Sequence, residues 1–225
     1  MLEPVGPSAQ AIAAVWWWML GVAVLVVMGV VGVWLLAMRR AQKERPGGAS
    51  DAQAARHGQR WIVGGGIVLP AVAIFALLVF GSSAGLHQMP IPPSGSGSGE
   101  ARAEPLRIDV VGQQWWWSLR YPGSGVHLRN ELRLPVGRPV HIHVGSRDVI
   151  HSFWVPRLGG KLDAIPGRTG VVRLQADQPG TFRGQCAEFC GLNHAHMVMT
   201  VIAMPAAEFD AWLAAQPAAE PGRRQ

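Results

Sequence analysis

Two long stretches without a charged residue constrain this chain more than any other feature of its sequence. The first runs from Ala11 to Met38 and the second from Trp61 to Gln88. At about 1.5 Å per residue, a helix over either stretch is long enough to cross the roughly 30 Å hydrocarbon core of a membrane. We therefore predict a hairpin of two transmembrane helices, at residues 11–38 and 61–86.

The segment between the two stretches, residues 39–60, is strongly basic. The positive-inside rule places this loop in the cytoplasm, and both ends of the chain, including residues 1–10, in the periplasm. A cleaved signal peptide is the alternative for the first stretch, but residues 1–10 contain Glu3 and no Lys or Arg, whereas a signal peptide begins with a basic region. We expect a retained anchor. The cations of the loop are Arg39, Arg40, Lys43, Arg45, Arg56 and Arg60.

Composition excludes two broad classes of protein. Of the 225 residues, 49% are hydrophobic and only 15% are charged, which excludes a disordered chain. The net charge of +6 does not indicate nucleic-acid binding, because much of the basic excess lies in the loop at residues 39–60. Two cysteines are too few for a disulfide framework.

The pattern changes after the second apolar stretch. Residues 87–103 combine a Pro-rich piece with a Ser-Gly alternation, which is typical of a linker. From residue 104 the chain has short β-type runs separated by turn signals, which predict a β-sandwich or Greek-key barrel over residues 104–216. A last helix is expected from Pro205, followed by a flexible tail at residues 217–225. The predicted strands are Leu106–Val111, Gln114–Tyr121, Val140–Val144, Thr169–Leu174 and Met197–Ala203.

One short segment, residues 185–197, carries the chemistry. It contains both cysteines, Cys186 and Cys190, followed by His194 and Met197. Thiolate, imidazole and thioether ligands together are typical of copper electron-transfer sites. A disulfide and a zinc site are the alternatives, although structural zinc sites rarely use Met.

Several further histidines are either candidate metal ligands or ordinary strand residues. His151, in a distant β-type run, is the best candidate for a further ligand. His196 competes with His194, and His141 and His143 are expected to be ordinary strand residues.

The segment at residues 185–197 resembles the copper A loop of subunit II of cytochrome c oxidase, with its C-x-E-x-C-x-x-x-H-x-x-M spacing. The aromatic segment at residues 111–118 and the segments at 151–156 and 161–168 also resemble that family, as does the order of hairpin and β-domain. The resemblance implies a cupredoxin-like Greek-key barrel. It also implies two copper ions, both bridged by Cys186 and Cys190.

The resemblance further implies a role for individual residues. One copper takes His151 and Met197, and the other takes His194 and the backbone carbonyl of Glu188. The side chain of Glu188 turns to a magnesium ion shared with subunit I. Trp115 matches the aromatic residue through which relatives receive electrons.

The implied activity belongs to a complex. The complex oxidises cytochrome c, which is soluble or membrane-anchored, and reduces dioxygen to water with proton translocation in a bacterial inner membrane. Subunit I holds the heme, this chain holds none, and subunit III is a further expected partner. Three other classes of protein agree less well with the sequence. A quinol oxidase subunit II lacks the copper ligands, and nitrous oxide reductase needs a propeller domain that a chain of this length cannot hold. A copper-carrying assembly factor does not need the Trp115 segment.

The sequence departs from the family at two places. Relatives dock a basic cytochrome c on an acidic rim, and Asp148 and Asp163 stand at matching positions, but Arg120 stands where relatives often carry a carboxylate. In many relatives a glutamate near the second helix opens a proton path into subunit I. Gly58 occupies that position here, and His57 is the candidate substitute.

Overall fold

The computed structural model describes residues 3–41, 51–86 and 105–216. The chain divides into two compact units, one of residues 14–83 and the other of the residues before 14 and after 83. We describe each unit by itself.

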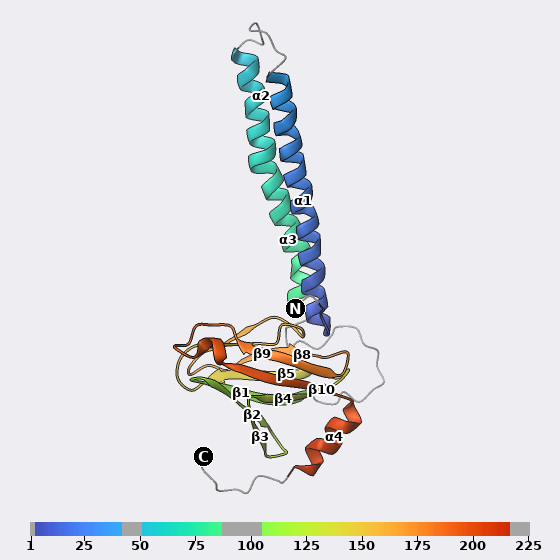
Figure 1. Ribbon diagram of the computed structural model, residues 1–225, viewed down its shortest axis with the longest axis vertical. Coiled ribbons are helices and arrows are strands. Elements are labelled where there is room, and N and C mark those ends of the chain that lie inside the picture. Colours follow the sequence, from blue (N-terminus) through green and yellow to red (C-terminus); the bar gives the residue numbers. More distant parts are fainter. Residues whose placement is uncertain (1–2, 42–50, 87–104, 217–225) are drawn as a thin grey trace. The chain divides into compact units, whose positions relative to one another are not determined.

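The first unit is helical (Figure 1). It is built from α1 (Pro7–Ala41), α2 (Asp51–Val63), η1 (Gly64–Val68) and α3 (Leu69–Leu86). Two segments, Pro7–Ala41 and Ala55–Val79, have the length and hydropathy to cross a membrane. Their apolar side chains are largely exposed, as expected for lipid-facing helices.

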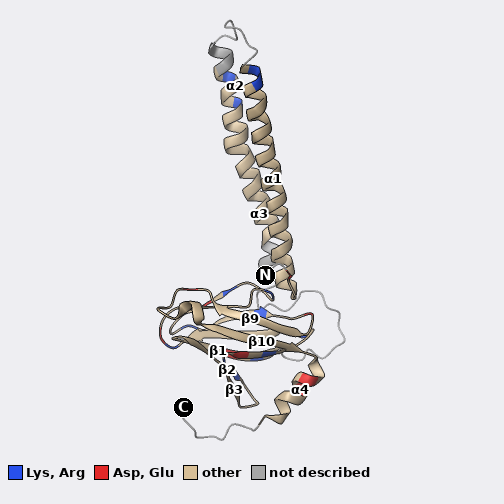
Figure 2. Ribbon diagram, viewed as in Figure 1, with Lys and Arg blue, Asp and Glu red and all other residues tan. Residues whose placement is uncertain are grey.

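The helix bounds differ from those predicted. The first helix begins at Pro7 and not at Ala11, and residues 51–60, expected to belong to a loop, form the first turns of α2. His57 and Gly58 therefore lie on a helix. The basic residues indicate where the apolar stretch ends, but the helix continues through them, because Arg and Lys are good helix formers. The described basic residues of this unit gather where α1 ends and α2 begins (Figure 2).

A widened π-helical turn, η1, interrupts the second helical segment just before Pro70. Its hydrogen bond runs from the Leu69 amide to the Gly64 carbonyl, five residues back. Pro70 has no amide hydrogen and its ring crowds the carbonyl four residues earlier, so the regular α-helical pattern cannot continue there. The glycines at 64–66 carry no side chains that oppose the widening.

The second unit is a sandwich of two five-stranded sheets (Figure 1). Sheet A has the order β3-β2-β1-β5-β8, and sheet B has the order β4-β10-β9-β6-β7. The predicted all-β, cupredoxin-like fold is confirmed. The strands of sheet A are β1 (Leu106–Gln113), β2 (Trp116–Tyr121), β3 (Val126–Arg129), β5 (Val140–Ser146) and β8 (Gly170–Leu174). Those of sheet B are β4 (Glu131–Pro135), β6 (His151–Trp154), β7 (Leu162–Ala164), β9 (Gly180–Cys186) and β10 (Val198–Met204).

The core lies between the sheets, because alternate residues of each strand point inward. Trp117 of β2 and Phe153 of β6 are the large aromatic residues at its centre, and both are fully buried. The closing helix α4 (Ala206–Ala215) buries Phe209 against the ring of Tyr121. The predicted C-terminal helix is confirmed, with Pro205 at its N-cap.

Residues 3–10, which we call the N-terminal clasp, pack onto the β-domain. The Val5 amide donates to the Arg157 carbonyl, and the Asp177 amide donates to the Val5 carbonyl, both at 2.8 Å. Val5 and Ala9 are each only 6% exposed. A Cβ on Gly6 would clash with the carbonyl oxygen of Gln175, so this position admits only glycine without rearrangement.

Candidate metal centre

The predicted ligands lie at one end of sheet B. His151 is the first residue of β6, Cys186 is the last residue of β9, and Met197 immediately precedes β10. Between Cys186 and Met197 the chain forms a loop with Cys190 and a short 3-10 helix, η2 (His194–His196). Because β6 and β10 both pair with β9, ligands that are far apart in the sequence become neighbours.

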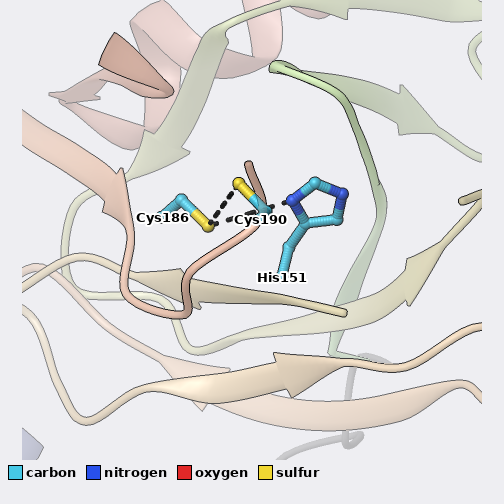
Figure 3. Close-up of side chains that lie close together, drawn as sticks. All are labelled: His151, Cys186 and Cys190. Atoms are coloured by element: carbon cyan, nitrogen blue, oxygen red, sulfur yellow. Dashed lines mark hydrogen bonds between the residues drawn. The ribbon is translucent and has the colours of Figure 1, made fainter. Parts of the chain in front are cut away.

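Sulfur and nitrogen atoms of these side chains converge, and Figure 3 shows three of the residues pointing toward one another. Cys186 Sγ lies 3.9 Å from Cys190 Sγ and 3.9 Å from His151 Nδ1. Cys190 Sγ lies 3.6 Å from His194 Nδ1 and 3.8 Å from Met197 Sδ. Two strands, β6 and β9, and the loop after β9 therefore bring the whole set of predicted side-chain ligands to one place.

The chemistry of this set fits copper. The two thiols are free, and their separation excludes the disulfide alternative in this structure, since an S–S bond is about 2.05 Å long. Thiolate and thioether ligands suit copper, and the Met197 thioether is unlike the Cys, His, Asp and Glu ligands of zinc sites. The carbonyl oxygen of Glu188 lies 3.2 Å from Cys186 Sγ, at the edge of the set. His151 and Met197 are fully buried.

Asp148 fixes the orientation of the His151 ring. Its Oδ1 lies 2.8 Å from His151 Nε2, on the side of the ring away from Cys186. A proton on Nε2 that is donated to this carboxylate leaves Nδ1 free to bind a metal. Burial raises the pKa of Asp148, but the hydrogen bonds from His151 and from the Gln114 and Val149 amides outweigh it, and the net pKa is lowered. The sequence suggested a docking role for Asp148 and missed this contact.

Two residues of sheet A support the same ring. A Cβ on Gly112 would lie 2.8 Å from His151 Cδ2, so the absence of a side chain on β1 is what gives the imidazole its space. The Trp117 ring packs edge-on, with its centroid 6.0 Å from that of His151 and 5.7 Å from that of Phe153. Sequence reasoning gave no role to Gly112, because a glycine next to Gln113 also suits a turn.

The turn between β1 and β2 contacts the ligand loop directly. Gln114 Nε2 and Trp115 Nε1 both donate to the carbonyl oxygen of Cys190, at 2.8 and 3.1 Å. Trp115, the predicted entry residue, is half-buried. It therefore joins the surface of the domain to the backbone of a ligand by one hydrogen bond.

The thiol of Cys190 is hard to ionise in the metal-free protein. Burial raises its pKa to about 12, and the neighbouring Cys186 thiol and Asp148 act in the same direction. Metal binding must displace this proton, because the thiolate is the ligand. Cys190 therefore becomes a thiolate only when a bound cation balances its negative charge.

Other predicted residues lie outside this cluster. The Glu188 side chain and Asp163 of β7 are exposed. His196 is exposed, whereas His141 and His143 lie on the outer face of β5 and belong to the sheet, as expected. Two apolar side chains of the ligand loop are strongly exposed, Phe189 at 76% and Leu192 at 96%.

The fold and the site define a class: a cupredoxin-like β-domain with a soft-ligand metal centre, joined to two helices that are long and apolar enough to span a membrane. Comparison with known proteins narrows this class. Residues 123–204 match the family described as cytochrome c oxidase subunit II, periplasmic domain. This match confirms the resemblance to subunit II of cytochrome c oxidase over residues 123–204.

Individual relatives agree with this assignment. The chain is 34% identical over 218 residues to cytochrome c oxidase subunit 2 of Alkalihalophilus pseudofirmus, covering 94% of this chain and 60% of that protein. It is 40% identical over 121 residues to the Synechocystis subunit, covering 54% of this chain and 36% of that protein. The chain thus spans three fifths or less of these relatives. The periplasmic domain of cytochrome oxidase subunit II from Bradyrhizobium japonicum is 35% identical, with 48% and 90% covered and a TM-score of 0.46.

Proposed function

We propose that this chain is the electron-entry subunit of a respiratory cytochrome c oxidase. In this proposal it accepts electrons from cytochrome c at a dinuclear copper A centre and passes them to heme in subunit I, where dioxygen is reduced to water with proton translocation. The observation that carries the proposal is the convergence of Cys186, Cys190, His151, His194 and Met197 within steps of 3.6 to 3.9 Å.

Each residue has a role in this proposal. Cys186 and Cys190 would be shared by the two copper ions, His151 and Met197 would hold one ion, and His194 and the Glu188 carbonyl would hold the other. Two copper ions bridged by two thiolates supply a one-electron carrier whose geometry changes little between oxidation states. The contacts of Cys186 with His151 and of Cys190 with His194 support this division of the two imidazoles.

Further roles follow from the family and from exposure. Trp115 receives electrons and relays them to the Cys190 backbone, to which its indole nitrogen is hydrogen-bonded. The exposed Glu188 side chain is free to reach a magnesium ion at the boundary with subunit I. We place the two helices in a bacterial inner membrane, with both termini and the β-domain in the periplasm and residues 39–60 in the cytoplasm. Subunit III is a further proposed partner.

The test of the copper assignment uses the full chain in detergent, loaded with copper. We expect two copper ions per chain and the purple, mixed-valence spectrum of a dinuclear centre. Cys186→Ser or Cys190→Ser should abolish that spectrum, because each removes a bridging thiolate. His196→Gln is the matched control, since this exposed histidine of the same loop should leave the spectrum unchanged. One copper per chain with a blue spectrum in the parent protein would refute the proposal.

The proposed orientation is tested by cysteine labelling. A Ser50→Cys variant should react with a membrane-impermeant reagent only after cells are opened, because residues 39–60 are proposed to be cytoplasmic. Reaction from the periplasmic side in intact spheroplasts would reverse the orientation.

A further inference from the structure

The outer face of sheet A is rich in arginine. Arg107 of β1, Arg120 of β2, Arg129 of β3 and Arg173 of β8 alternate with residues that point toward the core, and so point away from it. Strand register places them in adjacent rows: Arg120 lies opposite Asp109, and His141 lies between Arg107 and Arg173. We call these four arginines the basic face.

One carboxylate serves this face among the described residues. Asp109 binds Arg107 at 2.7 Å and Arg120 at 2.8 Å, so a single negative charge is shared between two cations. Arg129 lies over the Trp116 ring, 4.3 Å from its centroid, and no carboxylate in the described chain pairs with Arg129 or Arg173. The face therefore keeps a net positive charge of about three.

The pKa shifts of two histidines on this sheet agree with the net positive charge of the basic face. Burial lowers the pKa of His141, and the charges of His143 and Arg173 lower it further. Burial also lowers the pKa of His143, and Arg107 acts in the same direction while Asp109 opposes it. The charged form of both histidines is therefore disfavoured, and the positive charge of the face comes mainly from its arginines.

The basic face lies next to the proposed entry residue. Arg129 of that face contacts the Trp116 ring, and Trp116 directly follows Trp115, which is hydrogen-bonded to the Cys190 carbonyl. Among the other acidic side chains of the described β-domain, Asp148 accepts from the Gln114 amide next to Trp115, and the rest belong to other strands, loops or α4. A partner that covers Arg129 would therefore sit beside Trp115, whereas Arg120 lies four residues beyond Trp116 along β2. Those other acids are Glu131, Asp148, Asp163, Asp177, Glu188, Glu208 and Asp210.

We propose that the basic face is the docking surface of the electron donor, and that this donor is a cytochrome c domain with an acidic surface around its heme edge. The inference rests on the proposed function, because only a copper A subunit needs an electron donor at Trp115. Complementary charge raises the association rate of such a pair and orients the heme edge toward the entry residue.

The test measures binding as well as electron transfer. The full chain in detergent, with and without copper, is titrated with an acidic and with a basic cytochrome c at several ionic strengths. Arg129→Glu/Arg173→Glu is compared with Arg138→Glu/Arg183→Glu, which makes the same charge change off the basic face. We expect the acidic cytochrome to associate at least tenfold more slowly with the first variant at low salt, and within about twofold of the parent rate with the control.

Three results would overturn the inference. These are faster association of the basic cytochrome with the parent chain, equal losses in both variants, and binding of anionic lipid vesicles that the first variant loses while cytochrome binding stays unchanged. The copper content and spectrum of the same samples report separately on the proposed function. Because docking is also measured on the copper-free chain, a failure to bind copper and a failure to bind the donor are distinguished.

Discussion

The two sheets of the β-domain contribute to the metal centre in different ways. Sheet B and the loop between β9 and β10 carry all of the proposed side-chain ligands, whereas sheet A carries none. Yet sheet A reaches the centre through Gly112 and Trp117, which contact the His151 ring from the other side of the sandwich. Sheet B and its loop thus carry the proposed ligands, and sheet A helps to hold one of them, His151, in position.

Among the tests of this difference between the sheets, replacement of Trp117 is expected to have the largest effect. Replacing this fully buried ring by alanine should lower the free energy of unfolding by about 3–5 kcal/mol, because it leaves a cavity between His151 and Phe153. Hydrogen exchange of the β1 and β6 amides in urea measures the loss. The control is Trp116→Ala, on the outer face of the same strand. An equal loss in the control would mean that sheet A does not support the site in this way.

Gly112 tests the same contact by adding atoms. In Gly112→Ala the new Cβ meets His151 at 2.8 Å, so the ring must move and copper affinity should fall about 10- to 100-fold. Gly145→Ala on the adjacent strand β5 is the matched control, because its Cβ meets nothing closer than 3.5 Å. Competition with a copper chelator measures both affinities, and similar values for the two variants would contradict the prediction.

Asp148 distinguishes ring orientation from donor docking. Asp148→Asn keeps the shape but removes the charge that holds the Nε2 proton of His151, so copper affinity should fall about tenfold. The exposed Asp163→Asn is the control and should leave copper affinity unchanged. If both variants keep their copper affinity and lose donor binding, Asp148 acts in docking only.

The smallest expected effect is a pH dependence of the copper-free chain. The folded pKa of Cys190 is about 12 against 9.0 for an ordinary thiol, so between these values the unfolded chain loses a proton that the folded chain keeps. Its contribution to stability is therefore complete below about pH 9 and is lost as the pH rises toward 12. Cys190→Ser should lack this part of the alkaline destabilisation. Unfolding curves of both chains from pH 8 to 11 that fall in parallel would contradict it.

Much of this architecture could be predicted because its signals are local. Uncharged runs predicted the helices, and five alternating runs predicted strands of both sheets. The strands β3, β4, β7 and β9 were not predicted, and in β9 Gly180 and Gly184 interrupt the pattern. The support of His151 could not be predicted, since Gly112 and Asp148 acquire their roles only when β1 and β6 face each other across the sandwich.

The N-terminal clasp has a consequence for how the protein is made. Hydrogen bonds join Val5 to Arg157 and Asp177, so the clasp unites residues that lie on either side of the two apolar helices in the sequence. The chain between them contains both apolar helices, and the two ends of this closed loop can meet only on one side of a membrane. In the proposed topology the clasp therefore forms only when both helices cross the membrane. A chain whose second helix failed to cross could then not seat Gly6 against Gln175.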